Sequence, residues 1–279
     1  MIALARRWWA GWQRRRDDAA VARRAIPDDL WKRTLVRYPF LRRSDPADAA
    51  ALRRLTSLFL DRKEFSAAGG LRLSNDVVVA IAAQAVLPVL RHGLEGYEGF
   101  VGIVVHPDQV VAHRSVTDDD GVVHEYDEIL AGEAVRGGPV MLSWRDVRGA
   151  RRSAADSYNV VIHEFAHVLD MADGIPDGMP LLPPWIGRRH WQRVLDDEFG
   201  RFVARLDASD EGTALDPYGA NGREEFFAVA TEAFFVAPRA MKAEHPQLYA
   251  LFESYYRQDP AAEPSGPGPR TRGGREASR

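Results

Sequence analysis

The 279-residue sequence contains no cysteine. This absence excludes disulfide bonds, thiolate metal ligands and a cysteine nucleophile, so any zinc has to be bound by histidine and carboxylate side chains. It also agrees with a reducing compartment, and we expect a cytoplasmic protein. The chain has no excess of positive charge either, with 37 basic and 40 acidic residues and a net charge of −3. Direct nucleic-acid binding, which usually relies on a basic surface, is therefore not expected.

A long apolar run near the N-terminus is also lacking. Residues 1–25 combine three tryptophans with arginines, and these arginines interrupt any run long enough for a secretion signal or a membrane-spanning helix. We predict a basic, aromatic N-terminal arm over residues 1–25, without membrane contact. A membrane-surface role of this arm is the weakest of three functional hypotheses, because the amphipathic stretch is short.

The hydrophobic pattern changes twice along the chain. Residues 26–100 show helical spacing, residues 101–147 contain short valine-rich runs typical of strands, and helical spacing then returns. We predict an α+β fold that is mainly helical with a small mixed sheet. One domain over residues 26–257 divides into a helical subdomain, 26–100, and a core, 101–257. The Pro- and Gly-rich residues 258–279 lack large apolar side chains and are predicted to be disordered.

The segment HEFAH at residues 163–167 matches the metal-binding pattern H-E-x-x-H. Residues four apart share one face of a helix, so His163 and His167 can converge on one ion, and Glu164 lies beside them as a general base. Ser157 or Asn159 can cap the helix, which supports its placement. The alternative is a pair of ordinary half-buried histidines.

A catalytic zinc site of this kind takes a third ligand from a later helix. The candidates are Glu224, Glu225 and Glu232, all within NGREEFFAVATEAFF. If Asn221 caps this helix, Glu224 can bond back to the cap, which leaves Glu225 for the metal. Glu232 lies about 10.5 Å further along the helix and cannot share the ion with Glu225. Helical phase therefore favours Glu225, with Glu224 and Glu232 as alternatives.

These residues resemble the Mlc titration factor A family of bacterial zinc peptidases, which is gluzincin-like and similar in its catalytic core to anthrax lethal factor. The resemblance rests on HEFAHVLDMADG at 163–174 and YGANGREEFFAVATEAFF at 218–235. It implies a zincin-like core over residues 101–257, with one Zn²⁺ held by His163, His167 and Glu225. It also implies that Tyr218 donates its hydroxyl to the reaction's oxyanion, whereas by itself Tyr218 would be a turn residue in DPYG.

One position departs from the lethal-factor pattern. Such sites carry an acidic residue four positions after the glutamate ligand, where this chain has Val229. A carboxylate that orients a ligating imidazole is still required, and Glu232 and Asp170 are both candidates.

The preferred functional hypothesis is a zinc-dependent, aminopeptidase-like enzyme that acts on peptides. The family resemblance adds a partner, a transcriptional repressor of the Mlc type that controls sugar uptake. The alternative is a regulatory binding protein that sequesters such a partner and uses zinc only structurally. We further predict that the strand in GGPVMLSW, residues 137–144, offers a free edge to an extended peptide.

Overall fold

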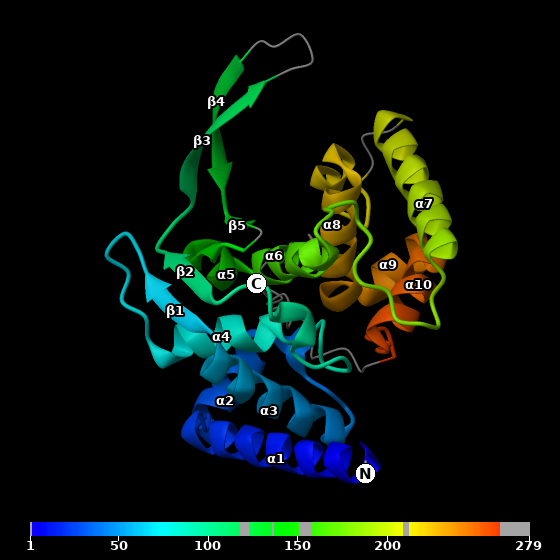
Figure 1. Ribbon diagram of the computed structural model, residues 1–279. Helices are drawn as coiled ribbons and strands as arrows, with labels where there is room; N and C mark the ends of the chain where they lie inside the picture. The colour runs from blue at the N-terminus through cyan, green and yellow to red at the C-terminus, as the bar shows by residue number, and fades with distance from the viewer. Residues whose placement is uncertain (1, 118–122, 136, 151–157, 209–211, 263–279) are drawn as a thin grey trace, which may run out of the picture.

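The computed structural model describes residues 2–117, 123–135, 137–150, 158–208 and 212–262 (Figure 1). Most of these residues are helical. The α-helices are α1 (Ile2–Arg23), α2 (Asp28–Arg37), α3 (Pro46–Arg62), α4 (Asn75–Ala85), α5 (Trp144–Gly149), α6 (Val160–Asp170), α7 (Arg188–Ala208), α8 (Arg223–Val236), α9 (Pro238–Glu244) and α10 (Pro246–Tyr256). The strands are β1 (Glu64–Ala67), β2 (Gly102–His106), β3 (Val110–Thr117), β4 (Val123–Leu130), β5 (Gly132–Ala134) and β6 (Val140–Ser143).

The strands form one mixed four-stranded sheet and one separate hairpin. The sheet order is β1-β2-β6-β5, in which β1, β2 and β6 run parallel and β5 runs antiparallel to β6. Strands β3 and β4 pair only with each other among the described residues, and their hairpin extends away from the body in Figure 1. The predicted α+β class with a small mixed sheet is confirmed.

Two details of the predicted sheet are wrong. Strand β1 lies inside the region that was predicted to be helical, because its short sequence EFSA has no apolar run to reveal it. The strand in GGPVMLSW is β6, and it pairs with β2 on one side and β5 on the other. Its edges are therefore occupied, and β5 is the edge strand at this side of the sheet.

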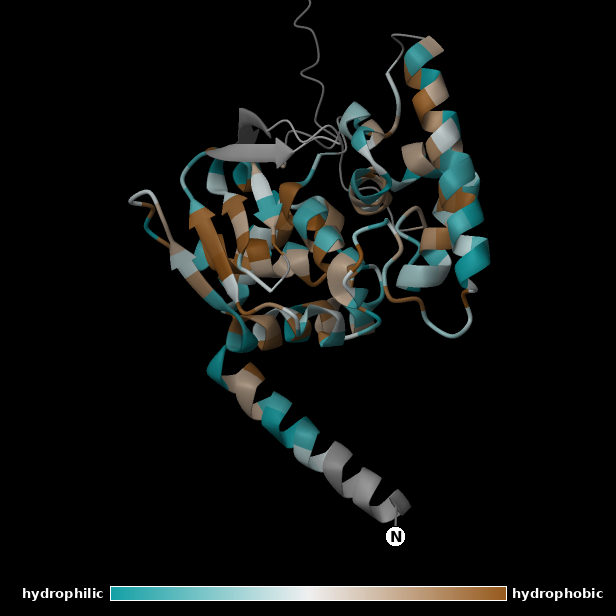
Figure 2. Cartoon of the chain, turned by 45° about the horizontal axis from the view of Figure 1, so that its top comes forward, coloured by the Kyte–Doolittle hydropathy of each residue, from teal (hydrophilic) through white to brown (hydrophobic). Residues whose placement is uncertain are grey.

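Helix α6 lies at the centre of the molecule, between the sheet, α4 and α8. Its buried face includes Phe165, whose ring packs edge to face against Phe59, Tyr97 and Phe100 at centroid distances of 5.6, 5.0 and 5.6 Å. The central strands of the sheet are also mostly hydrophobic (Figure 2). One continuous core extends from α2 to α10, so the buried residues of the N-terminal and C-terminal regions belong to the same cluster.

The two predicted terminal extensions are partly integrated into the body. Helix α1 packs on α3, where Ala20 is buried and Asp17 pairs with Arg62 at 2.8 Å. At the other end Gln258 is buried, and its side-chain nitrogen donates to the Leu87 carbonyl at 2.9 Å. The prediction of a disordered tail from residue 258 is therefore wrong for residues 258–262, and residues 263–279 lie outside the described part. No described helix is both long and apolar enough to cross a membrane.

Candidate metal centre

The first element of the centre is α6, which begins at a well-formed cap. The Asn159 side chain accepts the N–H of Ile162 at 3.0 Å and donates to Gln84 of α4 at 2.9 Å. The helix ends at Asp170, and a short 3₁₀ turn leads to Gly174, whose φ of 97° suits glycine. Of the two predicted caps Asn159 is confirmed, and Ser157 lies outside the described residues.

The two histidines of α6 point to the same place. Their Nε2 atoms lie 3.1 Å apart, and their rings are nearly perpendicular, with centroids 4.8 Å apart. The one-turn spacing therefore brings two imidazole nitrogens together, as the sequence predicts.

Helix α8 supplies the third group. Its N-cap is Gly222 and not Asn221, so the predicted capping residue is wrong by one position; Asn221 ends the preceding 3₁₀ turn. The shift does not change which glutamate faces α6. Glu225 Oε2 lies 3.1 Å from His163 Nε2 and 3.3 Å from His167 Nε2. The Glu224 carboxylate instead lies close to Gly222.

The three ligand atoms form a nearly equilateral triangle with sides of 3.1, 3.1 and 3.3 Å. Ligands of a tetrahedral zinc with bonds of about 2.0–2.1 Å are separated by about 3.3 Å, so the triangle has the size that zinc requires. In the described part of the chain, no other group of three or more histidine or acidic residues brings its ligand atoms this close together.

Glu232 orients the first histidine. Its Oε1 lies 2.7 Å from His163 Nδ1, and its Oε2 accepts the backbone N–H of Asn159. A proton on Nδ1 leaves the lone pair of His163 Nε2 directed at the centre of the triangle. Of the two candidate orienting residues, Glu232 therefore contacts an imidazole. Asp170 instead accepts the N–H of Gly178 at 3.0 Å.

The departure at Val229 is explained by the same helix. Glu225, Val229 and Glu232 lie on one face of α8, and the orienting carboxylate comes from the residue seven positions after Glu225. Val229 is 1% exposed and lines the cleft beside the centre. The carboxylate that contacts His163 thus stands three residues after Val229, and Val229 itself gives the cleft an apolar side chain.

Burial and neighbouring charges shift the pKa values of three side chains in the centre. Burial raises the pKa of Glu225, but the two adjacent imidazoles outweigh this effect and hold it at about 2. Burial lowers the pKa of His163, yet the neighbouring carboxylates of Glu225 and Glu232 raise it well above its ordinary value. The pKa of Glu164 is raised, mainly by burial. Glu225 is thus suited to bind a cation, and Glu164 holds a proton more readily than an ordinary glutamate does.

The centre opens into a cleft of about 340 Å³. Glu164 lies in its wall with only 5% of its surface exposed, whereas Tyr218 is 45% exposed and its ring centroid lies 6.0 Å from that of His163. Tyr218 stands in a 3₁₀ turn capped by Asp216, which accepts the Tyr218 N–H at 2.9 Å. The structure therefore brings Tyr218 to the same cleft as Glu164.

Sequence reasoning missed several residues of this cleft. Gly132, Tyr158 and Asp216 line it together with the predicted His163, Glu164 and Tyr218. Asp216 carries a signal that could have been used, since Asp followed by Pro commonly begins a turn. Gly132 carries none, because its place depends on strand pairing.

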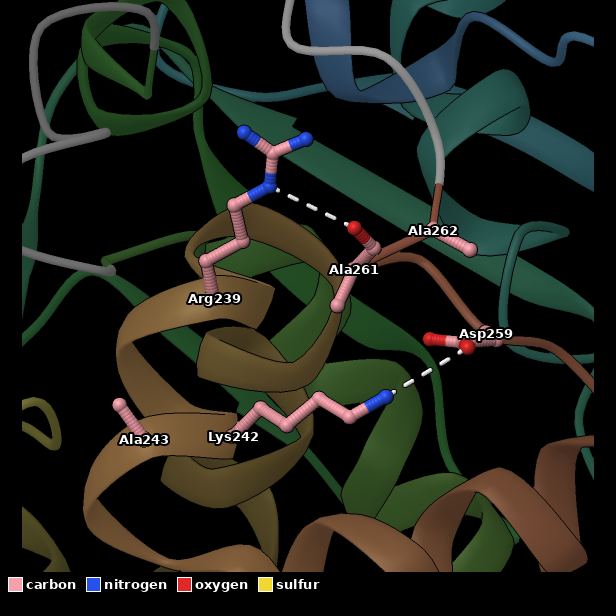
Figure 3. A pocket seen from close by; sticks show the side chains of 6 residues that line it. All are labelled: Arg239, Lys242, Ala243, Asp259, Ala261 and Ala262. Atoms are coloured by element: carbon pink, nitrogen blue, oxygen red, sulfur yellow. Dashed lines mark hydrogen bonds and ion pairs between the residues drawn. The ribbon is translucent and has the colours of Figure 1, made fainter.

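A second hollow lies between α9 and the segment after α10 (Figure 3). Its polar groups contact one another: Lys242 pairs with Asp259 at 3.5 Å, and Arg239 donates to the Ala261 carbonyl at 3.4 Å. It shares no lining residue with the cleft, and no histidine lines it. The side chains suited to metal binding and proton transfer therefore lie at the first site.

The chain is similar to known proteins over most of its length. A family model described as glucose-regulated metallo-peptidase M90 matches residues 9–257. An uncharacterized protein of Synechocystis is 33% identical over 254 residues, which cover 90% of each chain. The Mlc titration factor A of Edwardsiella ictaluri is 37% identical over 192 residues, 68% of this chain and 72% of that protein. That of Klebsiella pneumoniae is 33% identical over 232 residues, 82% of this chain and 86% of that protein. Each of these three relatives is matched over more than two thirds of both chains.

Proposed function

Because the chain belongs to the family of glucose-regulated metallo-peptidases M90, we propose that it is a zinc-dependent peptidase with aminopeptidase-like activity. In this proposal His163, His167 and Glu225 bind one Zn²⁺ per chain. The observation that supports it is the triangle of ligand atoms, whose sides of 3.1, 3.1 and 3.3 Å suit zinc. When bound, zinc supplies a Lewis acid that polarises a water molecule and the substrate carbonyl.

Glu164 is the general base in this proposal. Its carboxylate lies in the cleft wall next to the ligands. Burial raises the pKa of this carboxyl group, which makes it a better proton acceptor. It takes a proton from the attacking water and then delivers this proton to the leaving amine. Tyr218, on the exposed side of the cleft, donates a hydrogen bond from its hydroxyl to the oxygen of the attacked carbonyl.

An extended peptide would pair with β5. Ala131 accepts the N–H of Ser143 at 2.7 Å, so Ala131 faces β6, and in an antiparallel ladder the next residue faces the opposite way. The N–H and C=O of Gly132 therefore point to the open edge, beside the cleft. Backbone pairing at this edge would hold the peptide next to Glu164.

The partner proposal comes from the relatives. Several of them are named Mlc titration factor A, which suggests that this chain also binds a repressor of the Mlc type. The competing proposal is a regulatory binding protein with a structural zinc. The presence of a buried Glu164 beside the three ligands favours the enzyme, because a purely structural zinc site has no use for a general base.

Glu164→Gln tests the proposal. Glutamine keeps the shape of the side chain but cannot accept the proton, so hydrolysis of aminoacyl and peptide substrates should fall by about 100-fold or more. Zinc measured by atomic emission should stay near one per chain in the variant. If the wild-type chain binds zinc and a repressor but cleaves no peptide, the binding-protein alternative is correct.

A further inference from the structure

We infer that Gly132 is a positioning residue for the general base, and that the absence of a side chain at this position lets the Glu164 carboxylate lie directly against the edge strand. This inference rests on the proposed peptidase function and adds to it the residue that fixes where the base stands. It concerns one contact between β5 and α6, elements that pack against each other.

The contact is unusually close. A Cβ atom added to Gly132 would lie 2.5 Å from Glu164 Oε1, 2.6 Å from its Cγ and 2.8 Å from its Cδ. Three atoms of one side chain therefore occupy the space that any other residue at position 132 would need. The backbone of Gly132 does not have a positive φ, so this close approach is the reason for glycine here.

The same residue faces the substrate. As the ladder with β6 shows, the N–H and C=O of Gly132 point to the open edge of the sheet. Glu164 thus contacts the very residue whose backbone would pair with the peptide. Gly132 would therefore take part both in the backbone pairing that fixes the register of the peptide and in the contact that fixes the position of Glu164. This arrangement would hold the scissile bond within reach of the carboxylate.

A methyl group at position 132 would mainly displace Glu164. The atoms it meets belong to a side chain that can rotate, whereas β5 is held by its pairing with β6. Glu164 is buried and has little room, so its carboxylate would have to leave the wall of the cleft. Displacement of a catalytic group by about 1 Å can lower the rate by about 100-fold.

The test is Gly132→Ala in the zinc-loaded protein. We expect kcat to fall by about 100-fold with little change in KM, because the base is misplaced while the edge stays available. Zinc content should remain at the wild-type value. The matched control is Gly149→Ala, whose added methyl meets nothing within 4 Å, and its kinetics should equal those of the wild type.

A thermal double-mutant cycle gives a readout that does not depend on activity. Gly132→Ala should lower Tm in the wild-type background, but not in the Glu164→Ala background, where the space is free. Gly149→Ala should change Tm equally in both backgrounds.

The inference is overturned if Gly132→Ala keeps wild-type kcat, or if its effect on Tm is the same with and without Glu164. A wild-type chain that binds no zinc and hydrolyses nothing would instead overturn the proposed function. In that case the thermal cycle would still decide whether Gly132 and Glu164 are coupled, and the role of Gly132 in catalysis would fall with the enzyme.

Discussion

Four glutamates lie near the metal centre, and their surroundings separate their roles. Glu225 faces two imidazoles and has a pKa of about 2, after the opposing effect of burial. The pKa values of Glu164 and Glu232 are raised, in both cases mainly by burial. The carboxylate of Glu224 lies close to the N-cap of α8 instead of the histidines. Identical side chains thus differ in chemistry because their neighbours and burial differ.

The Glu232 carboxylate should strengthen zinc binding through its contact with His163. Glu232→Gln keeps an oxygen that can bond to the imidazole but removes the negative charge beside His163, which makes this ligand less basic. Zinc affinity, measured by competition with a chromophoric chelator, should fall by about 10–100-fold. Glu224→Gln is the control, because this carboxylate lies close to Gly222 and not to a ligand. Equal affinities of the wild type and the Glu232 variant would refute the orienting role.

Asp170 itself provides a pH-dependent prediction. Burial raises its pKa to about 7, from an ordinary value of about 3.9 in the unfolded chain. Between these two pH values the folded protein binds a proton that the unfolded chain has lost, so the free energy of unfolding falls as the pH rises from 4 to 7. The stabilisation is fully present below pH 4 and is lost above pH 7.

Asp170→Asn removes this titration. Relative to the wild type, the variant should become more stable across the same window, by at most about 4 kcal/mol. Urea unfolding of the zinc-free proteins at several pH values measures the difference, since a nearby cation would itself lower the carboxyl pKa. A difference that does not vary with pH would contradict the prediction.

The sequence predicts those side-chain contacts that depend on spacing within one helix. His163 and His167 converge because four residues make about one helical turn, and Glu225 faces them because of the phase of α8, although the cap was misplaced by one residue. Gly132 could not be predicted in the same way. Its contact with Glu164 joins residues 32 positions apart and depends on how β5 pairs.

The length of each strand decided whether the sequence could predict it. Strands β2, β3, β4 and β6 contain valine-rich runs and were predicted. Strands β1 and β5 have four and three residues, EFSA and GEA, with too little alternation to be seen. Because the sequence did not predict β5, it also predicted the wrong edge strand. In the structure β5 pairs with β6 and takes the edge position that was predicted for β6.

The segment that carries Tyr218 is anchored by a side chain of α9. Glu244 of α9 accepts the N–H of Ala214 at 3.1 Å and pairs with Arg205 of α7 at 3.1 Å. It therefore ties the start of this segment to two helices. Glu244→Ala should lower kcat/KM by about tenfold by loosening the segment, without loss of zinc.

Glu244→Gln is the matched variant, because glutamine keeps an acceptor for the Ala214 N–H. Its kcat/KM should stay close to that of the wild type. Steady-state kinetics and zinc analysis of both variants provide the test. If the alanine variant is as active as the wild type, the segment does not depend on this anchor.

In the molecule as a whole, the proposed metal ligands connect two regions of the chain. His163 and His167 belong to α6, which contacts α4 on one side and α8 on the other, whereas Glu225 belongs to α8. The core is continuous across these elements, so the fold does not need the ion to bring them together. Zinc should therefore add to the stability of a chain that is already folded.

The size of this effect can be predicted. A ligand at about 100 times its dissociation constant stabilises the folded state by about 2.7 kcal/mol, if it does not bind the unfolded chain. Weak binding to the unfolded chain is expected here, because the sequence has no cysteine. With about 2–4 °C per kcal/mol for a domain of this size, saturating zinc should raise Tm by about 5–10 °C over the chelator-treated protein.

Two single variants show whether this stabilisation comes from the proposed centre. Glu225→Ala removes one vertex of the ligand triangle, so Tm should no longer respond to zinc, measured by calorimetry with and without the ion. Glu224→Ala changes the adjacent residue, whose carboxylate lies near Gly222, and should keep the full response. If the Glu224 variant loses the response and the Glu225 variant keeps it, α8 presents a different glutamate to the ion, and the ligand set proposed for the enzyme is wrong.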